Sequence, residues 1–285
     1  QQRKDQGLQS LELTVGPPYD RLVVFHSTPL ASLNRETGFY QPIPLLDSDH
    51  EGSIIQQALS RVVMGKIDVE VRVATLDQFT EFFKQSEAHI LHITCSGSLD
   101  RLTMENGYGT VQTLSHDEMK QLLLLMKGEL RVVVVSSRHA NAIGQELIAA
   151  GVPHVVCCEW DHKFRDPIAI NFVHNFYRAL AEKKTLKRAY QIARLTASAS
   201  PRGRVIRRVL ERFQLLPVLA DNDPFHNIPV FFTQLVPPME TTFRSPALAV
   251  PPLPSNFLGR EIEMFTTLES LRGDEIIRIV GPQGS

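Results

Sequence analysis

The chain has 285 residues, with 30 Lys and Arg against 31 Asp and Glu, so its net charge is −1 at neutral pH. A charge this close to zero gives no electrostatic reason to expect nucleic acid or an acidic membrane as a partner. Three cysteines are too few for a disulfide scaffold and favour a reducing, cytoplasmic setting without disulfides. No apolar stretch approaches the roughly 18 residues that a membrane-spanning helix needs, and the polar residues 1–10 do not resemble a signal peptide.

Strands and helices are expected to alternate along the chain. In chain order, apolar periodicity and capping residues predict a strand at 21–26, a helix at 53–66, a strand at 69–75, a helix at 77–86, a strand at 88–94, a helix opening at Ser115, a strand at 131–137, a helix at 141–150, a strand at 153–158, a helix at 166–183, a helix at 185–198 and a strand at 229–235. This alternation predicts an α/β fold with a mostly parallel sheet covered on both faces. Functional groups in such sheets gather at the carboxyl ends of the strands, here after Thr94 and after Val135.

A proline-rich segment follows this pattern. Six of the 18 prolines fall between Pro237 and Pro254, which predicts an extended linker over 237–255. After it come the segment NFLGRE at 256–261, an amphipathic helix and a strand at 275–280, and the chain ends in GPQGS.

The end of the chain resembles the start of an NB-ARC-type module of the STAND NTPases, in which a GRE segment lies one helix ahead of the phosphate-binding loop. That loop has the pattern GxxxxGK[ST] after a strand. The resemblance makes residues 256–285 an N-terminal fragment of such a module, ending inside the loop, with Gly281, Gly284 and Ser285 as its first residues. No cofactor is then expected for the fragment itself, while the full-length protein is expected to bind ATP or ADP with Mg²⁺.

Residues 131–194 resemble the second half of a CHAT domain, a caspase-like family of cysteine peptidases. The matching stretches are VVVVSS, ELIAAGVPHVV, Trp160 and DPIAINFVHNFYRALAEKKTLKRAYQIAR. The first half fits through Ser27 and Pro29, the strand ending at Thr75, and ILHIT at 90–94. The resemblance implies a caspase-like three-layer sandwich with a central six-stranded sheet over residues 1–236.

The catalytic positions of the family are changed in this chain. The family carries a His-Gly pair after the strand that matches 90–94, and here that pair is Ser96-Gly97. The nucleophilic Cys position falls on Arg138 in a gapless comparison, or on Ser137 with a shift of one residue. A peptidase of this kind needs a thiolate and an imidazole within hydrogen-bond reach. We therefore expect a pseudo-peptidase without catalytic residues.

A rearranged dyad is the alternative. Cys95 precedes the His position and His139 follows the Cys position, so the first can be a nucleophile and the second its base. An offset of one residue at a strand end, however, turns a side chain to the other face of the sheet. The plainer interpretation makes Cys95 a small buried residue, His139 a loop residue, and His92 a hydrogen-bonded imidazole within a strand.

The remaining polar and charged residues point to no further chemistry. Cys157 and Cys158 are adjacent on a predicted strand and should face opposite sides, and with no suitably spaced partners we expect no metal site. Arg204, Arg208 and Arg212 share one face of a predicted helix, which suits either an anion or partner surface or a solvated face paired with acids.

Both resemblances together imply the N-terminal domain of a signalling switch. In STAND proteins nucleotide exchange drives oligomerisation, which clusters the N-terminal domain and recruits protein partners in immune, stress or cell-death signalling. The chain is then expected to provide a non-catalytic interaction, effector or autoinhibitory module. The alternative function is an active peptidase that uses Cys95 and His139 and is switched on by the same oligomerisation.

Overall fold

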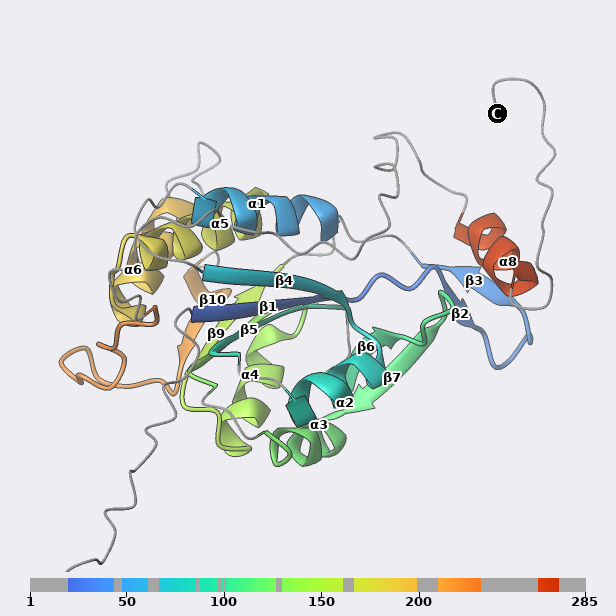
Figure 1. Cartoon of the computed structure of the whole chain (residues 1–285), viewed down its shortest axis with the longest axis horizontal. Coiled ribbons are helices and arrows are strands. Elements are labelled where there is room, and N and C mark those ends of the chain that lie inside the picture. Colours follow the sequence, from blue (N-terminus) through green and yellow to red (C-terminus); the bar gives the residue numbers. More distant parts are fainter. Residues whose placement is uncertain are drawn as a thin grey trace, which may run out of the picture.

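Six strands form one sheet in the order β10-β9-β8-β5-β1-β4 (Figure 1). They are β1 (Asp20–His26), β4 (Ile67–Val73), β5 (Ile90–Thr94), β8 (Val132–Ser137), β9 (Val155–Glu159) and β10 (Phe213–Leu216). Five pair in parallel, and β10 pairs antiparallel with β9 at the edge. The computed structural model describes residues 20–43, 48–60, 67–85, 88–96, 99, 101–126, 130–160, 167–198, 210–231 and 261–271. The predicted α/β fold with a mostly parallel six-stranded sheet is confirmed.

Helices cover both faces of this sheet (Figure 1). One face carries α1 (Ser48–Ser60), α5 (Pro167–Ala181) and α6 (Leu186–Ser198), and the other carries α2 (Leu76–Gln85), α3 (His116–Leu123) and α4 (Ala140–Ala149). The four consecutive valines of β8 alternate between the two cores, with Val132 and Val134 in the first and Val133 and Val135 in the second. All four are fully buried, as expected for a central strand covered on both faces.

Local signals for helix ends act as the sequence predicts. The Ser115 hydroxyl accepts a hydrogen bond from the amide of Glu118 at 3.3 Å, and the Glu118 carboxylate accepts one from the amide of Ser115 at 2.8 Å. These reciprocal bonds satisfy amides at the first turn of α3 that would otherwise be unpaired. Gly151 ends α4 with a φ of +100°, a conformation that costs a glycine little.

The strand predicted over residues 229–235 is wrong in its described part. Pro229 makes only an isolated bridge to Thr185, and the edge strand of the sheet is β10 instead. Proline has no amide hydrogen and cannot complete a ladder. Val230 and Phe231 are apolar because they pack into the first core, where they are 1% and 6% exposed.

Two hairpins outside the main sheet were not predicted. The first is β2 (Ala31–Leu33) with β3 (Tyr40–Pro42), and the second is β6 (Arg101–Glu105) with β7 (Val111–Ser115). In the turn of the second, the side-chain oxygen of Asn106 accepts hydrogen bonds from the amides of Tyr108 and Thr110. Gly107 and Gly109 have positive φ angles there, so this turn chemistry was present in the sequence.

Arg212 is not on a helix, contrary to the prediction. It directly precedes β10, and its Nε donates a hydrogen bond to the carbonyl of Glu159 at 2.9 Å, so it ties two neighbouring strands together. Its predicted companions Arg204 and Arg208 lie outside the described residues, as do the linker at 237–255, the strand expected at 275–280, and Gly281, Gly284 and Ser285. The predicted amphipathic helix after the GRE segment is present as α8 (Glu261–Leu271). Among the helices that the structure describes, none combines the length and apolar character needed to cross a bilayer.

Candidate functional site

The two catalytic positions of the peptidase pattern lie at neighbouring strand ends. Strands β5 and β8 pair with Thr94 opposite Ser136, so the same register carried two residues further brings Ser96 opposite Arg138. Ser96 is half-buried, and its carbonyl accepts a hydrogen bond from the amide of Thr103 at 2.9 Å. Arg138 is exposed. The positions thus follow the ends of two paired strands, and they carry a hydroxyl and a guanidinium where the peptidase pattern has an imidazole and a thiol.

One residue earlier, three small polar side chains form a row across the sheet. The register of β1, β5 and β8 places Ser27, Cys95 and Ser137 side by side, and each is no more than 1% exposed. Burial raises the pKa of the Cys95 thiol to about 12, and its contact with the Ser137 hydroxyl offsets only part of that rise. A thiol with this pKa is protonated at neutral pH and is a poor nucleophile. Cys95 is thus the small buried residue of the plainer interpretation.

His139 follows the end of β8 and precedes α4. It occupies the position just before α4, with no side-chain hydrogen bond to the helix, and it is half-buried. Its positive charge acts on Glu159 at the end of β9, although burial is the larger influence and raises the pKa of that carboxyl. His139 is thus the loop residue of the plainer interpretation.

The opposite face of the same strand ends holds a buried polar network around His92. The ring is fully buried, with Nδ1 2.8 Å from the hydroxyl of Tyr177 and Nε2 3.0 Å from that of Thr94. Nε2 also lies 3.4 Å from Oε1 of Glu51, and the Thr94 hydroxyl donates a 2.8 Å hydrogen bond to Oε2 of Glu51. His92 is therefore hydrogen-bonded as predicted, and it joins α1, β5 and α5.

The Glu51 carboxylate is the charged centre of this network. Its side chain is only 12% exposed. Burial by itself raises the pKa of Glu51, but the hydrogen bond and positive charge of His92, with smaller contributions from His26 and Thr94, outweigh burial and bring the pKa down to about 2. Glu51 thus stays ionised in the folded protein through most of the acidic range. Burial and the charge of Glu51 together raise the pKa of Tyr177.

Glu51 and Tyr177 were not identified from the sequence as partners of His92. A signal for them exists, because a histidine within a buried strand must find polar partners. Tyr177 lies on the buried face of α5 beside Phe176. Helical periodicity therefore indicates that its hydroxyl has to be satisfied inside the protein.

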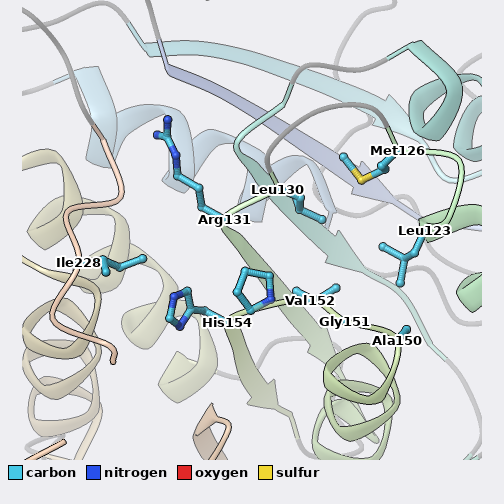
Figure 2. A pocket seen from close by; sticks show the side chains of 10 residues that line it. Leu123, Met126, Leu130, Arg131, Ala150, Gly151, Val152, His154 and Ile228 are labelled. Atoms are coloured by element: carbon cyan, nitrogen blue, oxygen red, sulfur yellow. The ribbon is translucent and has the colours of Figure 1, made fainter. Parts of the chain in front are cut away.

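A cavity of about 460 Å³ lies at the other end of the sheet, where β8 and β9 begin (Figure 2). Arg131 and His154 line it, together with apolar side chains that include Met126. Nη1 of Arg131 binds Oδ1 of Asp20 at 2.9 Å, and Nδ1 of His154 lies 2.9 Å from Nδ1 of His226. These polar atoms have partners within the protein, so we assign no chemistry to this cavity.

The remaining cysteines are buried core residues. Cys157 packs in the second core and Cys158 in the first, which confirms that they face opposite sides of the sheet. Burial raises the pKa of the Cys157 thiol above its ordinary range. Among the described residues, no group of three or more His, Cys, Asp or Glu side chains is arranged to hold a metal ion.

Comparison with known proteins supports the family indicated by the motifs. The model of the CHAT domain matches residues 3–229, while no curated protein matches the chain. Among solved structures, the Arg-specific cysteine proteinase gingipain R is similar with a TM-score of 0.45 and 11% identity, over 68% of this chain and 45% of that one. Pyridoxal kinase from Staphylococcus aureus, in complex with AMP-PCP and pyridoxal, is similar with a TM-score of 0.31 and 12% identity, over 64% of this chain and 87% of that one. TM-scores this low support no inference. The family match spans most of the chain, and the protein belongs to the CHAT-domain family of caspase-like peptidases.

Proposed function

We propose that residues 1–236 form a pseudo-peptidase module that acts through protein interactions, as an effector or autoinhibitory domain. In this proposal the linker 237–255 joins it to an NB-ARC-type NTPase module that begins at residue 256. The whole protein is then a STAND-type signalling ATPase of the cytoplasm, which binds ATP or ADP with Mg²⁺ and recruits protein partners through oligomerisation. Immune, stress or cell-death signalling is its expected setting.

The observation that carries this proposal is the chemistry at the ends of β5 and β8. Cysteine peptidase chemistry requires a thiolate that is activated by an imidazole. Ser96 and Arg138 provide neither group, and the nearest thiol, that of Cys95, is buried with a pKa of about 12. At pH 7 about 10⁻⁵ of such a thiol is ionised, against about 3% of an ordinary thiol with a pKa near 8.5.

The alternative is a peptidase that uses Cys95 and His139 after an oligomerisation-driven rearrangement. It is favoured only by the place of Cys95, one residue from the catalytic position. The rearrangement has to bring the thiol out of the buried row between Ser27 and Ser137 and place it within hydrogen-bond reach of His139.

Thiol labelling of the 285-residue chain tests the catalytic part of the proposal. The protein is treated with iodoacetamide near pH 7, and labelled sites are mapped by mass spectrometry for the wild type, His139→Ala and Cys95→Ser. We expect Cys95 to react at least 100-fold more slowly than free cysteine, at a rate that His139→Ala leaves unchanged. Rapid labelling of Cys95 that is lost in His139→Ala would overturn the pseudo-peptidase assignment. Labelling in 6 M urea shows that the site is chemically intact.

Nucleotide binding tests the NTPase part. We expect the full-length protein to bind ATP in a Mg²⁺-dependent manner, and Gly281→Val to abolish binding, because a side chain at the first loop glycine blocks the approach of the backbone to the phosphates. Wild-type binding of ATP that Gly281→Val leaves intact would refute the assignment of residues 281–285 to a phosphate loop.

A further inference from the structure

Helix α8 packs against the first hairpin, far from it in sequence. Phe265 of α8 is 3% exposed and forms a small apolar cluster with Leu30 and Ala31. The partly buried side chains of Ile262 and Met264 pack against this cluster. The rings of Phe265 and Tyr40 lie with their centroids 4.4 Å apart. Figure 1 shows α8 beside β2 and β3, beyond the carboxyl end of β1.

The surface under α8 is built from two segments that are fixed to each other. The amides of Leu30 and Ala31 donate hydrogen bonds to the carbonyl of Gly109, at 2.8 and 3.1 Å, and Ala31 forms a bridge with Thr110. Gly109 has a φ of +85°, and a Cβ there would lie 3.2 Å from Leu30 and 3.6 Å from Leu268 of α8. The β6–β7 turn therefore supports the hairpin from one side and approaches the helix closely.

This surface is apolar and lies apart from both main cores. Its cluster contains three buried residues and is separate from the two clusters that hold the sheet and its helices together. Around it, Leu33, Phe39, Tyr40 and Tyr108 are between 44% and 74% exposed. Exposed apolar side chains around a docked helix are typical of an interaction surface.

The occupant also has the properties of a docked helix. An isolated helix of 11 residues is marginal in water, so α8 depends on the hairpin for its stability. Among the residues of α8 whose burial is described, Phe265 is the one buried side chain, and a single aromatic anchor is typical of helix-in-groove recognition. Residues 232–260 connect α8 to the rest of the chain, so docking is intramolecular and benefits from a high effective concentration.

We propose that the β2–β3 hairpin and the β6–β7 turn form a helix-docking surface whose occupant is α8 of the same chain. This inference rests on the proposed function, in that α8 then belongs to the NTPase module and the contact holds that module against the CHAT domain. The surface is linked to the candidate site through the backbone: only Thr28 and Pro29 separate Ser27 from Leu30, and the amide of Thr103 in β6 binds the carbonyl of Ser96. Release of α8 uncovers the apolar residues Leu30 and Ala31, which follow the end of β1.

Hydrogen exchange of the 285-residue chain, followed by mass spectrometry, tests the docking. Three proteins are compared: the wild type, Phe265→Ala, and Glu269→Ala, which alters an exposed residue of the same helix. We expect Phe265→Ala to speed exchange of α8 and of residues 30–42 by roughly tenfold or more, the effect of truncating an aromatic anchor. Exchange in β5 and β8 stays unchanged, and Glu269→Ala behaves as the wild type.

A second variant changes the hairpin instead of the helix. Tyr40→Ala should raise the rate of hydrogen exchange within α8, because it removes the ring that packs against Phe265. The proposal is overturned if α8 of the wild type exchanges as fast as α8 of Phe265→Ala, or if Phe265→Ala loosens β5 and β8 to the same extent as the hairpin. These readouts use neither nucleotide nor thiol reactivity. Docking of α8 in a full-length protein that fails to bind ATP would therefore refute the NTPase assignment and leave the docking surface standing.

Discussion

Replacing Glu51 with glutamine should destabilise the protein in a manner that depends on pH. Glu51→Gln keeps the size of the side chain and one oxygen for the Thr94 hydroxyl, but it removes the negative charge that faces His92 at 3.4 Å. The substitution thus imitates the protonated form of the acid. The difference between variant and wild type isolates the contribution of the charge.

The pKa of Glu51 sets the size of the effect. In the folded protein this pKa is lowered from 4.5 to about 2, since His92 outweighs the burial that would raise it. A group whose pKa is lowered on folding stabilises the folded state above its unfolded pKa and loses this contribution as the pH falls through the folded value. The contribution is therefore complete above pH 4.5 and disappears toward pH 2. A difference of 2.5 pKa units corresponds to about 3 kcal/mol.

Urea unfolding measures this contribution, with the fluorescence of Trp160 as the signal. Trp160 is the single tryptophan and packs against the first core. We expect Glu51→Gln to lower the free energy of unfolding by about 3 kcal/mol at pH 7 and by much less at pH 3. Glu182→Gln is the matched control, because Glu182 pairs with Arg178 on the surface, and it should change stability by less than about 0.5 kcal/mol. Equal losses for Glu51→Gln at both pH values would refute the assigned role of the charge.

Three further substitutions test other parts of the structure. Gly144→Ala should destabilise the protein by about 1–3 kcal/mol in urea unfolding, because its Cβ would overlap Sγ of Cys157 and lie 2.9 Å from Leu216; a gain in stability, as expected from helix propensity alone, would contradict this packing. Asp20→Asn should cost about 3 kcal/mol, since it leaves the Arg131 guanidinium without its carboxylate at 2.9 Å, and a loss below 0.5 kcal/mol would show that the pair behaves as a surface ion pair. Burial and the charge of His226 lower the pKa of His154 from 6.5 to about 4, so stability should fall as the pH drops from 6.5 to 4. His154→Gln should flatten the unfolding free energy across this range, and an unchanged pH profile would argue against the shift.

The sequence was sufficient to predict the five parallel strands of the sheet, because these strands are recognisable on their own, but it did not predict the edge strand β10. The valines of β8 are apolar at every position, as a strand covered on both faces requires. Capping at Ser115 and the left-handed Gly151 fixed helix ends through contacts within a few residues. In the described part of the predicted strand at 229–235, apolar character was misleading, because Val230 and Phe231 are buried without joining the sheet.

The changed catalytic positions were also visible in the sequence, since they depend on residue identity at known places in a motif. Ser96 and Arg138 carry neither a thiol nor an imidazole in any conformation. The sequence did not show which side chains near these positions face one another. That depends on the register of three strands and on the face of the sheet to which each side chain points. Only the fold places Cys95 between Ser27 and Ser137 and buries its thiol.

The sequence by itself thus determined the family, the layers of the fold and the residue types at the expected catalytic positions, because these follow from local pattern and residue chemistry. The tertiary structure alone decided the environment of each group. The pKa of Glu51 reflects a histidine that lies 41 positions along the chain, and Phe265 is buried by a hairpin more than 220 residues before it. Contacts between distant segments leave no periodic signal in the sequence. The periodicity of a helix or strand shows which of its faces is buried, but it does not show which other segment buries that face.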